Sequence, residues 1–228
     1  MSAYNIAFQY ATPHGVLTTV HIPDSPDPVP ERVLATLPSE EAEFARTLRA
    51  YRQVSFVGGR IALRHAAAQL GVDPPPILPD DRGAPVLPAA ISGSISHKRT
   101  MAVGMVGQAR NGTLGVDLED YAPARLSIAA SVLTPEEIAV VEALPEARRW
   151  IALLTRFSIK ESVYKAIDPY VHRYVGFQEA HVEPDLEGGA EVTLRLERQE
   201  KQEGPFRVDA RYRWLHGQLL TSVRIRPA

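Results

Sequence analysis

The stretch ISGSISHKRTMAVGMVGQARNGTLGVDLE, residues 91–119, decides the fold. Its β-forming and small apolar residues come in three runs, 91–96, 101–106 and 114–119, and the last two are separated by a turn at 110–112. Short runs of this kind, bounded by turn residues, are typical of strands. The stretch therefore predicts a three-stranded antiparallel meander.

Helical patterns flank this stretch on both sides. Before it, apolar residues at helical spacing predict a helical region that begins at Ser39 and is interrupted at Gly58-Gly59. After it, Thr134-Pro-Glu-Glu137 is a capping-box signature that opens a short helix. The longest helix is expected over 146–167, with Pro169 ending it.

Strand patterns return at both ends of the chain. The expected strands are a pair near the start and four antiparallel strands near the end: 4–10, 15–22, 175–182, 190–196, 206–214 and 219–225. The order strands, helices, strands, helices, strands predicts an α+β fold. We expect two halves, residues 1–113 and 114–228, each an antiparallel sheet packed with helices.

Composition bounds the class of protein. With 228 residues, 45% hydrophobic and 23% charged, the chain can bury a substantial core. The formal charge of -2 excludes the broad positive field of a general nucleic-acid binder. The absence of cysteine excludes thiol catalysis and cysteine-ligated metals, and it suits the cytoplasm. Without a secretory signal or an uncharged apolar run of membrane length, no membrane association is expected.

Two carboxylates share one face of a predicted strand. In Gly115-Val-Asp117-Leu-Glu119, both acids leave the same side while Val116 and Leu118 point to the other. Magnesium favours such oxygen ligands and fills its remaining positions with water and substrate phosphate oxygens. A solvent-facing polar strand face is the alternative, and such a triplet arises by chance about three times in a chain of this composition. The metal interpretation therefore needs support from elsewhere.

That support comes from the longest predicted helix. Its segment Phe157-Ser-Ile-Lys160-Glu161-Ser-Val-Tyr-Lys165 carries two of the four lysines in the chain. Glu161 and Lys165 share a helix face, and an ordinary surface ion pair is the alternative interpretation. The pair lies at the rim of the apolar stripe formed with Phe157 and Tyr164, and a rim position suits a cleft.

A set of side chains that could donate hydrogen bonds to a phosphate lies upstream. The segment 92–99 places hydroxyls, including that of Ser96, with His97 and two cations at a strand end and its turn. His97 fits equally well as a histidine whose hydrogen bonds are met within the fold. Arg52 and Arg60 would lie about two turns apart only if one helix ran straight through the two glycines.

The sequence lacks the motifs that define several enzyme classes. A Ser/His/Asp hydrolase has Ser94, Ser96, His97 and Asp117 available, but Ser96 stands where the G-x-S-x-G elbow needs its second glycine. No P-loop, G-x-G-x-x-G or H-E-x-x-H motif occurs. The sequence therefore gives no support for a triphosphatase, a dinucleotide-binding enzyme or a zinc protease of these types.

Taken together, Gly115–Glu119 and Phe157–Lys165, about 40 residues apart, resemble the paired signature of the phosphopantetheinyl transferases. Phe56-Val-Gly-Gly-Arg60 and Gly93-Ser-Ile-Ser-His97 also resemble upstream motifs of that family, in its long single-chain group of surfactin-type and enterobactin-synthase-type enzymes. The resemblance implies two similar α+β halves with coenzyme A and magnesium in the cleft between them. It also implies transfer of 4′-phosphopantetheine from coenzyme A to a serine of an acyl or peptidyl carrier protein, releasing adenosine 3′,5′-bisphosphate.

The resemblance also assigns roles to residues. Asp117, Glu119 and Glu161 match the metal-binding acids, and Glu161 matches the proposed general base as well. The residues that match contacts to coenzyme A are basic or polar: Arg52, Arg60, Ser96, His97, Lys160 and Lys165. Of these, His97 with the two arginines matches the 3′-phosphate pocket, and Lys165 also stabilises charge as the pyrophosphate bond breaks.

Two departures from the family pattern stand out. Many relatives carry a lysine before a proline in the loop ahead of residue 91, where this chain has Ala84-Pro85 with Arg82 close by. Position 162 is serine where a small alanine is frequent, which is a mild change. The three acids are intact.

Two other functions use the same residues. A magnesium-dependent nucleotide pyrophosphohydrolase would use the same three acids with water in place of the carrier serine. A module that binds carrier protein or coenzyme A without turnover is the non-enzymatic alternative. For the transferase we expect a small acidic carrier partner, no nucleic acid, and a monomer.

Overall fold

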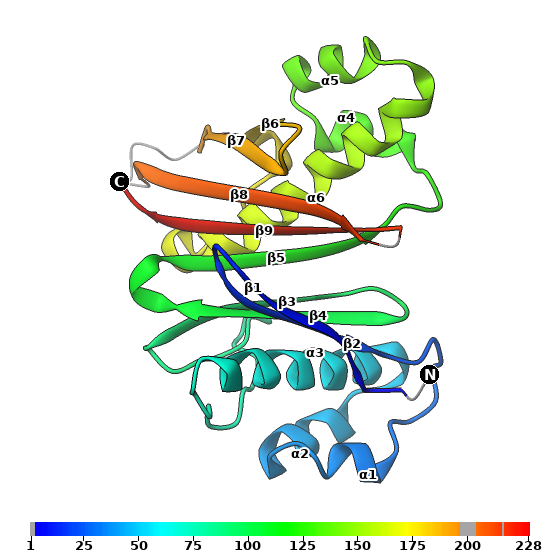
Figure 1. Cartoon of the computed structure of the whole chain (residues 1–228), viewed down its shortest axis with the longest axis vertical. Helices are drawn as coiled ribbons and strands as arrows, with labels where there is room; N and C mark the ends of the chain where they lie inside the picture. Colours follow the sequence, from blue (N-terminus) through cyan, green and yellow to red (C-terminus); the bar gives the residue numbers. More distant parts are fainter. Residues whose placement is uncertain (1–2, 197–203, 216) are drawn as a thin grey trace. The chain divides into compact units, whose positions relative to one another are not determined.

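The computed structural model describes residues 3–196, 204–215 and 217–228, and it divides into two compact units, Met1–Asn111 and Gly112–Ala228. Each unit is an antiparallel sheet packed with helices (Figure 1), which confirms the predicted α+β class.

The first unit is built on a four-stranded sheet with the order β1-β2-β4-β3. Its strands are β1 (Ile6–Thr12), β2 (Gly15–His21), β3 (Ile91–His97) and β4 (Met101–Gln108). The terminal strand pair was predicted correctly. Helix α3 (Ala50–Gln69) packs on the sheet and runs along its strands (Figure 1), and the short α1 (Glu31–Leu34) and α2 (Ser39–Thr47) precede it.

Helix α3 runs unbroken through Gly58-Gly59, so the predicted interruption there is wrong. A side chain at Gly59 would come within 2.7 Å of Ile95 on β3, and one at Gly58 would collide with Ile22. The two glycines thus let the helix approach the sheet closely and do not end it. The real break lies earlier, where Leu48 is extended and Ala50 has a φ of +50°.

The second unit is a five-stranded sheet with the order β5-β9-β8-β7-β6. Its strands are β5 (Thr113–Asp120), β6 (Ala180–Pro184), β7 (Gly189–Leu194), β8 (Phe206–Leu215) and β9 (Gln218–Pro227). The antiparallel tail was predicted correctly, although residue 216 of its last turn is outside the described residues. The strand predicted over 175–182 begins only at Ala180, five residues late, because Phe177–Glu179 forms a 3-10 turn.

The predicted meander over 91–119 is wrong in its last strand. β3 and β4 pair, but β5 pairs with β9, about 100 residues further along the chain. A 3-10 turn at Ala109–Asn111 and a φ of +113° at Gly112 redirect the chain between β4 and β5. A side chain at Gly112 would collide with the carbonyl oxygen of Ile225, so glycine permits the pairing with β9.

Helix α6 (Glu146–Val171) packs on this sheet and continues four residues past the predicted end (Figure 1). Pro169 lies inside the helix, two residues before its end, so the helix tolerates the hydrogen bond that the proline removes. The end itself is made by His172 in the left-handed conformation, with a φ of +50°. The short helices α4 (Ala129–Val132) and α5 (Pro135–Glu142) complete the unit.

The capping box that opens α5 is present as predicted, with the Thr134 hydroxyl accepting from the Glu137 amide and the Glu137 carboxylate accepting from the Thr134 amide. The described part of the chain contains no helix both long and apolar enough to cross a membrane.

Candidate active site

The two acids of β5 face helix α6. Asp117 and Glu119 are 4% and 5% exposed, and they share their strand face with Gly115. A side chain at Gly115 would collide with the carbonyl oxygen of Ser162 on α6. The missing side chain therefore lets α6 lie directly against β5, and the two carboxylates beside it are largely shielded from water.

Asp117 is held from two sides by α6. The Ser158 hydroxyl donates to its Oδ2 at 2.8 Å, and the Lys165 ammonium donates to its Oδ1 at 3.0 Å and to the carbonyl of Val116 at 2.9 Å. Lys165 keeps 27% of its side chain exposed. The pair combines a buried carboxylate with a cation that reaches the surface.

A group of hydroxyls lies behind Asp117, and it was not predicted from the sequence. Ser158 and Ser162, one turn apart on α6, both lie against Thr221 of β9, at 3.0 and 2.7 Å between hydroxyl oxygens. Thr221 also donates to the Ser158 carbonyl at 2.9 Å. The i,i+4 spacing of two serines on an otherwise buried helix face was the available signal, but the strand partner was not predictable from it.

The three predicted metal-binding acids lie on two elements of the second unit. Glu119 Oε2 lies 3.7 Å from Nη2 of the exposed Arg125, and Asp117 forms an ion pair with Lys165. Glu161 is half-buried on α6. Among the described residues, no three side chains of ligand type gather closely enough to hold an ion. The structure thus places two of the three acids on one strand face and leaves the third on the neighbouring helix.

Lys160, which was predicted to contact a phosphate, has its ammonium group surrounded by protein acceptors. Lys160 is 2% exposed, and its ammonium group donates to Glu137 Oε2 at 2.6 Å, to the Val132 carbonyl at 2.8 Å and to the Phe177 carbonyl at 3.0 Å. An ammonium group has three hydrogens, and all three are used inside the unit. Burial lowers the pKa of Lys160, and the Glu137 carboxylate opposes that shift.

Glu137 and Lys160 form one buried ion pair that joins several elements. Besides Lys160 and the Thr134 amide, Glu137 accepts from the Val182 amide of β6 at 2.7 Å. The pair therefore ties α5, α6 and β6 together. Sequence reasoning identified Glu137 as a cap but not as the partner of a lysine 23 residues away.

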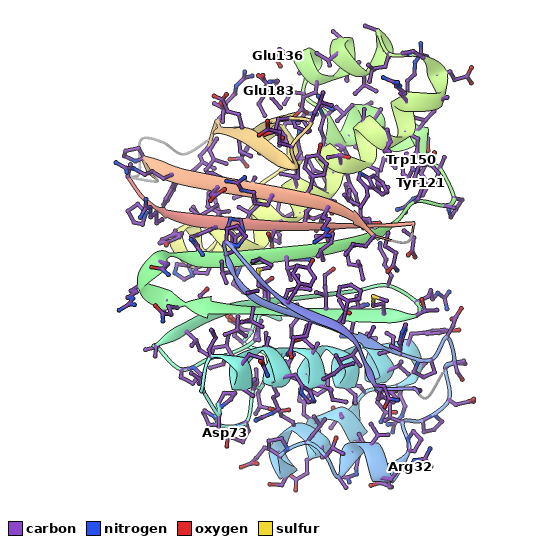
Figure 2. The ribbon with its side chains drawn as sticks, viewed as in Figure 1. Arg32, Asp73, Tyr121, Glu136, Trp150 and Glu183 are labelled. Carbon is purple, nitrogen blue, oxygen red and sulfur yellow. The ribbon has the colours of Figure 1, made fainter. Side chains whose placement is uncertain are left out.

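The chain leaving β5 is anchored to α6. Trp150 lies beside Tyr121 (Figure 2), and its indole N–H donates to the Tyr121 carbonyl at 2.5 Å. Tyr121 directly follows β5. This contact fixes the end of the strand that carries Asp117 and Glu119.

In the first unit, Arg60 is buried on α3 at 5% exposure. Its Nε donates to the Ile77 carbonyl at 2.6 Å, and its guanidinium stacks on Phe56 at 4.3 Å from the ring centre. Burial lowers its pKa to about 10. In the part of the chain that the structure describes, no protein acceptor takes its two terminal nitrogens. A buried cation with an open donor fork is suited to an anion.

His97 and Ser96 end β3, with Ser96 buried and His97 exposed. Helix α3 lies along β3 so that Leu63 contacts Gly93 and Gly59 contacts Ile95. This progression places His97 beside the amino-terminal half of α3.

Arg52 is exposed in that same half of α3. The neighbouring Tyr51 is covered by Arg99 from the turn after β3, at 4.1 Å from the ring centre. The structure thus brings Arg52 and His97 to one end of the helix and sheet, and it places Arg60 two turns further along α3.

Comparison with known proteins identifies both units. The model of the 4′-phosphopantetheinyl transferase N-terminal domain matches residues 40–107, and that of the 4′-phosphopantetheinyl transferase superfamily matches residues 113–215.

Individual relatives agree with the family models. The chain is 34% identical over 200 residues to 4′-phosphopantetheinyl transferase PptT of Mycobacterium tuberculosis, covering 83% of this chain and 86% of the relative. It is 34% identical to the transferase Svp of Streptomyces mobaraensis, covering 81% and 74%. The Chronobacterium ammoniagenes ACPS-CoA complex matches 51% of this chain and 97% of that one at 21% identity, with a TM-score of 0.41. The chain therefore belongs to the 4′-phosphopantetheinyl transferases, enzymes that transfer 4′-phosphopantetheine from coenzyme A to carrier proteins.

Proposed function

We propose that the chain carries out this transfer as a magnesium-dependent reaction, with its acids in the second unit and its 3′-phosphate contacts in the first. The observation that carries the proposal is the buried Asp117 and Glu119 pair on β5, with Lys165 beside it at 3.0 Å. Buried carboxylates next to a surface-reaching cation suit a site where a metal and phosphate oxygens meet.

The residues present fit a magnesium ion in kind. Asp117 and Glu119 are hard oxygen donors on one strand face, and a magnesium site needs only one or two carboxylates when substrate phosphates and water supply the rest. The ion would supply neutralisation of the charge that develops on the leaving group.

Glu161 is assigned the role of general base and third metal-binding acid. It is half-buried on α6, between the two α6 residues that contact Asp117. Its carboxylate would take the proton from the carrier serine, directly or through water, as that oxygen attacks the β-phosphate. The phosphopantetheine bond to the serine oxygen forms as the bond to adenosine 3′,5′-bisphosphate breaks.

Lys165 is assigned to the pyrophosphate and Lys160 is not. Lys165 is partly exposed, so its ammonium can donate to a phosphate oxygen as charge builds on it. Lys160 is buried in the pair with Glu137 and keeps the elements around the site together.

Arg60, Arg52 and His97 are assigned to the 3′-phosphate, with Ser96 next to His97. Arg60 supports this best, because its guanidinium is buried and its terminal nitrogens take no protein acceptor in the described residues. We propose that residues of both units act on one coenzyme A molecule and that the chain works as a monomer on an acyl or peptidyl carrier protein.

Intact-mass spectrometry of an apo carrier protein tests the proposal. Incubation with this protein, coenzyme A and Mg²⁺ is expected to add one phosphopantetheine, roughly 340 Da, and a chelator is expected to abolish the gain. Transfer that survives the chelator would remove the metal from the reaction. An unchanged carrier mass with cleavage of a nucleotide pyrophosphate would favour the hydrolase instead.

A further inference from the structure

A loop carbonyl fixes the orientation of Arg60. Because the Nε hydrogen is committed to the Ile77 carbonyl at 2.6 Å and the guanidinium plane lies on Phe56, the two terminal nitrogens point in one set direction. An arginine fork whose plane is already held in place loses less conformational freedom when it binds a phosphate. The position of the Ile77 carbonyl therefore matters to any anion that meets Arg60.

The Ile77 peptide is itself held by Glu41 of α2. The Ile77 amide donates to Glu41 Oε1 at 2.6 Å, and both residues are fully buried. Glu41 lies 36 positions before Ile77 in the sequence, so this contact ties the loop after α3 to the helix before it. A buried carboxylate is retained only when its hydrogen bonds and charge are matched.

Arg64 completes the match. It forms a two-pronged ion pair with Glu41, at 2.7 Å from Nη2 and 3.1 Å from Nε to Oε1. The same guanidinium donates to the carbonyls of Pro74 and Pro75, both at 3.0 Å. Two arginines one turn apart on α3 therefore hold the loop at three carbonyls. Arg60 binds that of Ile77, and Arg64 binds those of Pro74 and Pro75.

We propose that Glu41 is a positioning residue for coenzyme A recognition: through the Ile77 peptide it fixes the Arg60 fork toward the 3′-phosphate. This inference rests on the proposed role of Arg60. Glu41 touches no substrate in this scheme, because its carboxylate is buried behind the loop. Its effect would appear as selectivity for the 3′-phosphate and not as a general loss of transfer.

The test compares coenzyme A with 3′-dephospho-coenzyme A as substrates of the full-length protein. The 3′-phosphate preference is the ratio of their kcat/KM values, measured for wild type, Glu41→Gln, Arg60→Ala and the double variant. Glu41→Gln is expected to lower the preference about tenfold, through KM for coenzyme A with kcat nearly unchanged. In the Arg60→Ala background the same substitution is expected to change the preference no further.

Two further variants keep the test decisive. Glu41→Asp keeps the charge opposite Arg64 but shortens the reach to the Ile77 amide, and it is expected to lower the preference even where Glu41→Gln folds poorly. Glu31→Gln breaks the exposed pair between Glu31 and Arg46 in the same unit, and it is expected to leave the preference unchanged.

The outcomes separate this inference from the proposed function. If wild type shows no preference for the 3′-phosphate, or Arg60→Ala keeps it, the assigned role of Arg60 fails. If Arg60→Ala loses the preference while both Glu41 variants keep it, only the positioning role fails. An equal effect of Glu41→Gln with and without Arg60 would make Glu41 a residue of general stability, and it would overturn the inference.

Discussion

The carboxylate of Glu161 stands on α6 three residues after Ser158 and four before Lys165, the two residues that hold Asp117. Glu161→Gln keeps the size of the side chain and removes its charge and its capacity to accept a proton. We expect kcat to fall by about 10²- to 10⁴-fold with the fold retained. Rates of carrier-protein modification measure the loss, and circular dichroism checks the fold.

The matched control is Glu146→Gln, an exposed glutamate in the first turn of the same helix. It is expected to leave kcat unchanged. Turnover of Glu161→Gln at the wild-type rate would show that Glu161 is not the general base.

Lys160 and Lys165 have different environments, so we expect substitution of one to affect mainly stability and substitution of the other to affect mainly transfer. Lys160→Met leaves Glu137 as a buried carboxylate without its cation, so we expect the free energy of unfolding to fall by about 3–5 kcal/mol. Lys165→Met removes a partly exposed cation, so it is expected to lower the free energy of unfolding less and the rate of transfer more than Lys160→Met does. Urea unfolding and carrier modification measure the two effects.

A stable Lys160→Met protein with a raised KM for coenzyme A would instead support the phosphate contact that the sequence predicted for Lys160. Sequence spacing could identify both lysines, since they share a helix with Glu161. It could not tell the buried one from the surface one, because the partner that buries Lys160 is supplied by another helix.

At the scale of elements, the contact between β5 and α6 depends on one glycine. A methyl group at Gly115 would collide with the carbonyl oxygen of Ser162, which is backbone and cannot rotate away. Gly115→Ala is therefore expected to lower the free energy of unfolding by about 1–3 kcal/mol or more. Thermal or urea unfolding measures the change.

Gly176→Ala is the matched control in the same unit. The nearest atom to a methyl group there is 3.9 Å away, and the residue has an ordinary negative φ, so stability is expected to stay the same or rise slightly. A Gly115→Ala protein as stable as this control would mean that α6 can shift away from β5 without cost.

Elements with their own local signals were predictable, and those set by distant partners were not. The capping box at Thr134 and the strands of the tail carry their pattern within a few residues. The course of α3 through Gly58-Gly59 and the pairing of β5 with β9 depend on Ile22, Ile95 and Ile225, which lie elsewhere in the chain. A glycine pair signals a break or a close approach equally well, and only the tertiary contact decides between them.

At the scale of the whole molecule, the residues assigned to the reaction are divided between the two units. Arg60 and His97 belong to Met1–Asn111, whereas Asp117, Glu119 and Glu161 belong to Gly112–Ala228. If one chain supplies the full set as a monomer, two variants that each lack one of these groups cannot repair each other. Mixing Arg60→Ala with Glu161→Gln is therefore expected to give only the sum of their separate rates of transfer.

Carrier modification measured at several ratios of the two variants checks this expectation. In an assembly whose copies share their sites, some mixed sites would combine an intact Arg60 from one chain with an intact Glu161 from the other, and transfer would reappear. Restored activity that grows with protein concentration would therefore contradict the monomer and show that copies of the chain complete each other. Unchanged summed rates across all ratios would support a complete set of reacting groups within each single chain.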